Sequence, residues 1–285
     1  MSLSLNTRAS IQAFYVFGKL FFMLYCQVNG QPVDVLPVED RGFAYGDGHF
    51  TTGKICRGRL ELVAEHIARL QFGCRKLQIS PPDWEQLSAE VKDLAARYPL
   101  AVMKVMITAG QGGRGYSRRG TAEANVIIQV HDYPGHYASW SRQGITLGVC
   151  EQKIGLNPLL AGLKHLNRLE QVLIRQELDR CNEDELLVFN INDEIVEASC
   201  ANVFWLQDGC WFTPDLSDSG VAGLARASML ETLGGVKVVR AKLPQLSDIS
   251  AMFICNAVMG VVPVREFNRR ALDIAPVLAL KSSFS

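Results

Sequence analysis

The chain has 285 residues, of which 48% are apolar and 20% are charged, and its 29 basic residues are balanced by 29 acidic ones. This length can bury a sizeable core and predicts two modest domains. The even charge balance and the scattered distribution of basic residues argue against a protein that binds nucleic acid.

The eight cysteines lack the paired spacing of metal ligands or of a disulfide framework. We therefore expect no bound metal, and free thiols in a reducing cytoplasm. Residues 11–26 are apolar and aromatic, but Gly18 and Lys19 interrupt them, and the run is too short to span a membrane. It also lacks the small-residue cleavage site of a signal peptide. We expect no association with membranes.

Short strands alternate with helices in residues 23–130, which we expect to form a small N-terminal domain. Asn29-Gly30 predicts a two-residue hairpin turn between strands at 24–28 and 31–35. Asp83 is expected to cap a helix, because its carboxylate can accept free N–H groups of the first turn. The other elements expected here are strands at 49–56, 59–63, 102–109 and 125–130, and helices at 64–77 and 84–98.

Residues 131–144 show little periodicity and are interpreted as a linker to a larger C-terminal domain of residues 145–285. The helix expected at 167–181 has an apolar side with Val172, Leu173 and Leu178. The other elements expected here are strands at 145–150, 185–191, 195–198, 202–207, 210–213, 237–240 and 251–256, and a helix at 224–233. The pattern predicts an α+β fold of two domains with mixed, largely antiparallel sheets.

Lys164 is a lone lysine among small and apolar residues, in the sequence Pro-Leu-Leu-Ala-Gly-Leu-Lys. A half-buried amine loses solvation when it is protonated, so its pKa falls and it can act as nucleophile and base near neutral pH. The alternative is an ordinary lysine at a strand end with its amine in water. His165 follows directly, points to the opposite side of an extended chain, and is interpreted as a packing residue.

Two later segments carry further candidates. Glu197 lies on a predicted strand, before Ala-Ser-Cys-Ala-Asn and an apolar run. The sequence Ser-Gly-Val-Ala-Gly at 219–223 places glycines directly before a predicted helix, whose free N–H groups and dipole favour a phosphate dianion. Taken alone, Glu197 is equally compatible with an exposed strand glutamate, and the glycines with an ordinary helix start.

Together these motifs resemble the fold-type IV enzymes that use pyridoxal 5'-phosphate, from about residue 23 to about residue 264. Lys-His-Leu-Asn-Arg-Leu-Glu-Gln, from Lys164 onward, is most similar to the 4-amino-4-deoxychorismate lyase branch. The resemblance implies that Lys164 forms a Schiff base with the cofactor. It also implies that Glu197 keeps the pyridine nitrogen protonated, which makes the ring a better electron sink. Relatives begin shortly before an Asn-Gly turn, so residues 1–22 are interpreted as an N-terminal extension or a misassigned start.

The resemblance also implies which residues bind the cofactor phosphate. Leu224 and Ala225 would donate their main-chain N–H groups, and Arg69 would reach the phosphate from the small domain. Ala257 would contribute its backbone, although many relatives carry a hydroxyl residue there. Without the resemblance, Arg69 would be interpreted as a solvated helix arginine.

In the lyase branch the products are 4-aminobenzoate and pyruvate, on the route to folate. A substrate with two carboxylates calls for cationic or hydroxyl partners. We expect Arg114 and the nearby Tyr116 to bind the substrate from the glycine-rich loop 110–117. Such an arginine can also be a mobile surface residue. The other candidates are Thr51 and Thr52, Tyr45, and Asn256. Threonines on strands are usually structural.

A D-amino-acid or branched-chain aminotransferase would use the same Lys164, Glu197 and Arg69. It would differ by interconverting the aldehyde and amine forms of the cofactor with an amino acid and a 2-oxo acid. A protein that binds the cofactor without catalysis is disfavoured, because the lysine and the glutamate are both present. The resemblance further implies a cytoplasmic homodimer.

Overall fold

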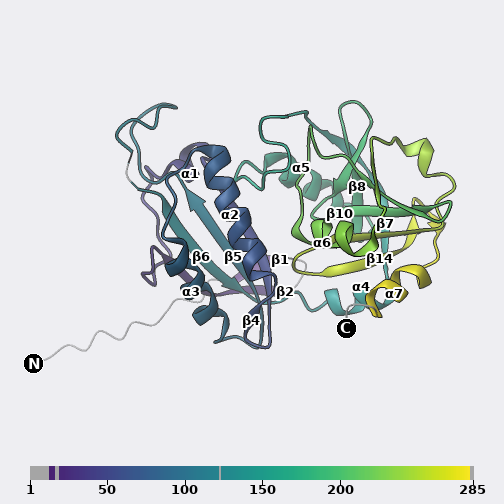
Figure 1. The fold of residues 1–285 in the computed structure, drawn as a ribbon, viewed down its shortest axis with the longest axis horizontal. Helices are drawn as coiled ribbons and strands as arrows, with labels where there is room; N and C mark the ends of the chain where they lie inside the picture. Colours follow the sequence, from purple (N-terminus) through teal and green to yellow (C-terminus); the bar gives the residue numbers. More distant parts are fainter. Residues whose placement is uncertain (1–12, 17–18, 122, 283–285) are drawn as a thin grey trace, which may run out of the picture.

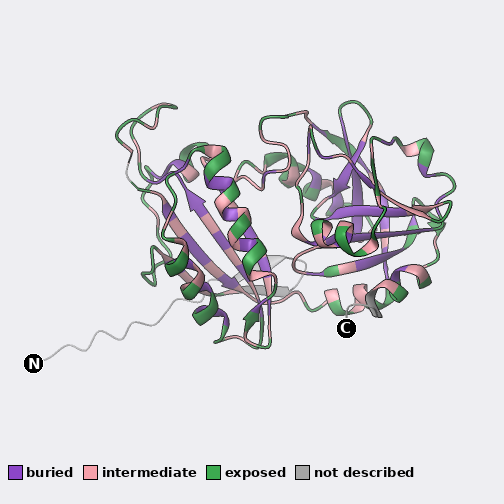
Figure 2. Ribbon diagram, viewed as in Figure 1, coloured by how far each residue is buried: buried purple, intermediate pink, exposed green. Residues whose placement is uncertain are grey.

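The computed structural model describes residues 13–16, 19–121 and 123–282, which form two units side by side (Figure 1). Each unit is built around its own sheet and has its own buried core (Figure 2). The expected α+β class with two sheets is confirmed. Within the described part of the chain, no helix is long and apolar enough to cross a membrane.

The first sheet has six strands in the order β1-β2-β6-β5-β3-β4, and its neighbouring strands pair antiparallel. Helix α2 packs against β3, and α3 lies next to α2. The bounds are β1 Ala13–Val16, β2 Lys19–Val28, α1 Arg41–Tyr45, β3 Gly48–Cys56, β4 Arg59–Leu60, α2 Val63–Leu77, α3 Trp84–Ala95, β5 Leu100–Thr108 and β6 Asn125–His131.

Local sequence signals predicted the positions of most helices and strands in this unit. Asp83 caps α3 as expected, since its carboxylate accepts the N–H groups of Glu85 and Gln86. The Asn29-Gly30 turn forms with positive φ at both residues. The strand expected at 31–35 is absent, and only an isolated bridge follows the turn. Pro32 explains this, because proline has no N–H for a ladder.

The segment 1–22 falls largely outside the described residues. Its described parts belong to β1 and β2, and β2 runs through the boundary predicted at residue 23.

The second sheet has the order β12-β11-β10-β13-β14-β7-β8-β9, with β15 paired to β14. It is mixed, because β7 is parallel to both β14 and β8. The strands are β7 Ile145–Ile154, β8 Glu185–Asn190, β9 Ile195–Ala198, β10 Asn202–Gln207, β11 Cys210–Pro214, β12 Lys237–Val239, β13 Ala251–Asn256, β14 Gly260–Phe267 and β15 Arg270–Ala271. The helices are α4 Tyr137–Gln143, α5 Leu169–Leu178, α6 Leu224–Leu233, the short 3-10 helix Leu243–Leu246, and α7 Ala275–Ser282.

Two expectations for this unit need correction. The segment 131–144 contains α4, so much of the expected linker is helical. In α5 the buried side chains are Ile174 and Leu178, whereas Val172 and Leu173 are 49% and 54% exposed. Helix α5 packs on β7 through the pair four residues apart, which lies on one helix face.

The segment around Lys164, in the second unit, forms hydrogen bonds with the first unit. The N–H of Phe50 donates to the carbonyl of Lys164 at 2.9 Å, and the N–H of Leu166 donates to the carbonyl of Gly48 at 3.0 Å. The chain after β7 therefore docks on the start of β3, and this contact brings the lysine to the junction between the sheets.

Candidate active site

A cavity of about 680 Å³ lies at this junction. Strand β3 and helix α2 supply one side of it, and the segments around Lys164, β9 and the start of α6 supply the other. Its lining includes Phe50, Thr52, Arg69, Tyr137, Lys164, Arg168, Arg175, Glu197, Cys200, Leu224, Asn256 and Ala257.

Lys164 projects its amine into this cavity. Its Nζ lies 4.7 Å from the centroid of the Phe50 ring. Burial, together with the positive charges of Arg168 and Arg69, lowers the pKa of the Lys164 amine to about 8 against the opposing effect of Glu197. A substantial fraction of the amine is therefore unprotonated just above neutral pH, as expected for a nucleophile or base.

Arg168 supports Lys164 in a way that the sequence did not reveal. Its Nε donates to the carbonyl of His165 at 2.8 Å, and its Nη2 donates to the carbonyl of Leu163 at 3.0 Å. The guanidinium thus holds the peptide groups on both sides of the lysine. His165 lines a different cavity from Lys164, as expected for the next residue of an extended segment.

Glu197 lies in β9 and is only 7% exposed. One carboxylate oxygen accepts the N–H of Val221 at 2.9 Å. Burial raises the pKa of the Glu197 carboxyl, while this hydrogen bond and the charges of Lys164 and Arg168 oppose the rise. The structure therefore places a buried carboxylate in the same cavity as the amine.

The start of α6 forms a third side of the cavity. Leu224 lines it, whereas Ala225 is buried and is not among the lining residues. The first N–H groups of a helix have no acceptor within that helix. Arg69 donates from α2 to the carbonyl of Ala222, and burial lowers its pKa to about 10, so it stays charged at neutral pH.

These groups fit pyridoxal 5'-phosphate. A single cavity holds an amine of lowered pKa, a buried carboxylate, and a helix N-terminus with a charged arginine beside it. They suit, respectively, an aldehyde, a protonated pyridine nitrogen and a phosphate.

The predicted substrate residues divide between two places. Asn256 lines the Lys164 cavity, and its Nδ2 donates to the carbonyl of Cys200 at 3.1 Å. Thr51 is 2% exposed and faces α2, where its Oγ1 lies 2.6 Å from Nδ1 of His66. Side chains alternate along a strand, so Thr52, rather than Thr51, lines the cavity.

Tyr45 and Tyr116 line a separate cavity of about 420 Å³, and their rings meet edge to face at 5.6 Å. Arg114 is exposed and lines neither of these two cavities. Within the described chain, the structure therefore does not bring Arg114, Tyr116, Tyr45 or Thr51 to Lys164.

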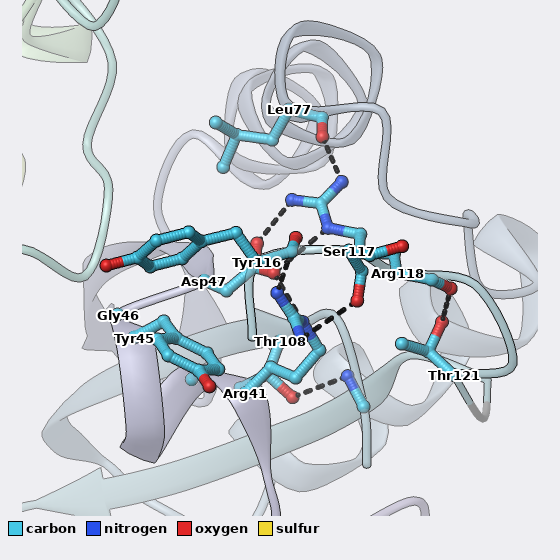
Figure 3. A network of polar contacts seen from close by, with 12 residues as sticks. Arg41, Tyr45, Gly46, Asp47, Leu77, Thr108, Tyr116, Ser117, Arg118 and Thr121 are labelled. Carbon is cyan, nitrogen blue, oxygen red and sulfur yellow. Dashed lines mark hydrogen bonds and ion pairs between the residues drawn. The ribbon is translucent and has the colours of Figure 1, made fainter. Parts of the chain in front are cut away.

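Two unpredicted arginines hold the glycine-rich loop (Figure 3). Arg41 is 2% exposed, and its guanidinium donates to Asp47 and to the carbonyls of Gly115 and Tyr116. Arg118 also donates to Asp47. Burial would raise the pKa of the Asp47 carboxyl, but the hydrogen bonds from both arginines outweigh it and the net effect is a lowered pKa.

Known proteins are similar to this chain in sequence and in fold. Residues 48–267 match the amino-transferase class IV family. The chain is 41% identical to an aminodeoxychorismate lyase of Vibrio harveyi, over 83% of this chain and 89% of that protein. It is 22% identical to a D-alanine aminotransferase of Listeria monocytogenes, over 80% of each chain. The structure of a 4-amino-4-deoxychorismate lyase from Pseudomonas aeruginosa superposes with a TM-score of 0.85, at 34% identity, over 91% of this chain and 97% of that chain.

The chain therefore belongs to the class IV aminotransferase family, whose fold-type IV enzymes use pyridoxal 5'-phosphate. The resemblance seen in the sequence motifs is confirmed.

Proposed function

We propose that this chain is a pyridoxal-phosphate-dependent lyase that converts 4-amino-4-deoxychorismate into 4-aminobenzoate and pyruvate. The observation that carries the proposal is the Lys164 amine of lowered pKa in a cavity shared with Glu197 and the start of α6. The similarity to two aminodeoxychorismate lyases supports this reaction within the family.

Each part of the cavity has a role in holding the cofactor. Arg69 and the N–H groups of Leu224 and Ala225 would bind the phosphate, and the backbone of Ala257 would contribute to the same site. Glu197 would hold the ring nitrogen, and Lys164 would bind the aldehyde. When bound, the cofactor supplies an electron sink for the carbanion formed on the substrate.

Lys164 acts as the base once its amine is no longer bonded to the aldehyde. Its Nζ removes the proton from the substrate carbon that bears the amine, the carbon–oxygen bond to the enolpyruvyl group breaks, and the ring becomes aromatic. The removed proton is the one that enolpyruvate needs to become pyruvate, so the reaction balances without another proton donor. Aromatisation drives the reaction, and the protein mainly has to position the base and the leaving group.

Asn256 and Thr52 are the proposed substrate contacts that line the cavity. Arg114, Tyr116, Tyr45 and Thr51 remain predictions from the resemblance. We also propose a cytoplasmic homodimer, which the family resemblance supports.

The test is to supply the cofactor-loaded protein with 4-amino-4-deoxychorismate and to follow 4-aminobenzoate by fluorescence. We expect equimolar 4-aminobenzoate and pyruvate, and loss of both products in Lys164→Ala. An intact, cofactor-loaded protein that forms neither product would refute the lyase assignment.

The second candidate is a D-amino-acid or branched-chain aminotransferase. It is favoured by the Listeria relative and by the fold shared with the branched-chain aminotransferase of Escherichia coli, at a TM-score of 0.83. Incubation with D-alanine or leucine and a 2-oxo acid decides between the two. Rapid interconversion of the aldehyde and amine forms of the cofactor, without lyase activity, would establish the aminotransferase.

A further inference from the structure

The four residues before α6, here named the 220–223 strap, are attached to distant parts of the chain. The N–H of Gly162 donates to the carbonyl of Gly220, and the N–H of Ala222 donates back to the carbonyl of Gly162. Arg69 of the first unit binds the carbonyl of Ala222. Hydrogen bonds from distant parts of the chain therefore hold the strap in place before the helix begins.

Asn202 makes two of the remaining contacts of the strap. It lies at the start of β10 and is 5% exposed. Its Nδ2 donates to the carbonyl of Val221 at 2.9 Å, and its Oδ1 accepts the N–H of Gly223 at 3.1 Å. An amide can donate and accept at once in this way, whereas an ionised carboxylate only accepts.

Val221 of the strap also contacts Glu197. The N–H of Val221 donates to the Glu197 carboxylate, and its carbonyl accepts from Asn202. Helix α6 begins directly after Gly223. A single residue, Val221, therefore connects the carboxylate proposed for the ring nitrogen to the segment that leads into the N–H groups proposed for the phosphate.

We propose that Asn202 is a positioning residue that sets the span between Glu197 and the phosphate-binding end of α6. The ring nitrogen and the phosphate of pyridoxal phosphate are attached to one rigid ring, so both ends bind well only when the two protein groups keep a matching separation. A site displaced by about 1 Å loses much of its effect. The inference rests on the cofactor assigned above, but it holds for the lyase and the aminotransferase alike.

The space around Gly223 supports this role. A Cβ added to Gly223 would lie 2.0 Å from Oδ1 of Asn202. The φ of Gly223 is −70°, which an alanine can adopt, so close approach to Asn202 is what requires glycine here. Gly223→Ala therefore disturbs the same contact from the other side without straining the backbone.

The test compares Asn202→Asp and Asn202→Ala with a matched variant, Asn190→Ala. Asn190 is also a buried asparagine, 3% exposed, and among the described residues its amide bonds only with Asn192 and Glu194 of its own hairpin. Each cofactor-free protein is titrated with pyridoxal phosphate and with pyridoxal, which lacks the phosphate, and its unfolding is followed in urea. The phosphorus NMR signal of the bound cofactor is recorded as well.

We expect both Asn202 variants to bind pyridoxal phosphate at least about tenfold more weakly, with a shifted phosphorus signal and a smaller change in pyridoxal affinity. Asn190→Ala should lose stability without losing affinity. Gly223→Ala should behave as the Asn202 variants do, and should add little when combined with Asn202→Ala, so it also tests the proposal if the Asn202 variants fail to fold.

Unchanged affinity for pyridoxal phosphate in folded Asn202 variants would overturn the proposal. Equal weakening of pyridoxal and pyridoxal phosphate would also overturn it, because it would indicate a general structural role. A wild-type protein that binds neither compound would instead refute the cofactor assignment and, with it, this inference.

Discussion

The guanidinium of Arg168 holds the backbone on both sides of Lys164 and repels the proton on the lysine amine. The two effects act together, since the hydrogen bonds fix the direction of the side chain while the charge favours its neutral form. Burial makes the largest contribution to the lowered pKa, and Arg168 is the largest electrostatic contributor.

We therefore predict that Arg168→Met raises the pKa of Lys164 from about 8 towards its ordinary value of 10.5. Only the neutral amine reacts with an acylating reagent, so competitive labelling of the cofactor-free protein across pH measures this pKa. Lysine at position 168 preserves the charge, and Arg168→Lys should give a smaller rise. An unchanged labelling midpoint in Arg168→Met would show that Arg168 does not lower the pKa of Lys164.

A second prediction concerns the arginine that reaches the strap from the first unit. Arg69→Met removes a charge from the proposed phosphate site and a hydrogen bond to Ala222. A hydrogen bond to a charged group contributes about 1.5–3 kcal/mol, so the dissociation constant for pyridoxal phosphate should rise about tenfold to a hundredfold.

The control for this change is Arg75→Met, an exposed position on the same helix. Its affinity for the cofactor, measured by the same absorbance titration, should match that of the wild type. Comparable weakening in the two variants would point to damage to α2 in place of a lost phosphate contact.

Elements bounded by strong local signals were predictable from the sequence. Helix α6 has the predicted bounds, because Gly223 precedes it and Gly234 follows it. The strand expected after Asn29-Gly30 does not form, since the turn indicates only a chain reversal and Pro32 prevents a following ladder.

The candidate site was predictable where one segment carries the chemistry, as with Lys164 and Glu197. Alternation along β3 indicates that Thr51 and Thr52 face opposite ways, but only the packing of α2 decides which of them meets the cavity. The contact between Asp47 and Arg118 joins positions 71 residues apart, and no local pattern reports it.

A third prediction follows from that contact. Asp47→Asn removes the charge that Arg41 and Arg118 share, and should free the glycine-rich loop they hold. The loop 110–117 and the residues directly after it offer Arg114, Arg118 and Arg119 to trypsin, so limited digestion at these sites should become several times faster. Asp93→Asn, at an exposed position of α3, should leave the digestion unchanged. Equal digestion rates in all three proteins would show that the network does not restrain the loop.

The last prediction concerns stability in acid. His66 is 2% exposed, its Nδ1 contacts Thr51, and its Nε2 has no hydrogen-bond partner among the described residues. Burial, together with the nearby charge of Arg69, lowers the pKa of His66 to about 4. The unfolded chain binds this proton near pH 6.5, so between pH 6.5 and about 4 the unfolded state holds more protons.

The free energy of unfolding should therefore fall as the pH falls through this interval, by at most about 1.4 kcal/mol per pH unit for one histidine. In His66→Asn, whose amide can keep the contact with Thr51, the protein should be less stable at pH 7 but should lose less stability between pH 6.5 and 5. His49 and His165, whose pKa values burial also lowers to about 4, account for part of the remaining slope. Urea unfolding at several pH values measures both slopes, and parallel curves for wild type and variant would mean that His66 is not protonated during acid unfolding.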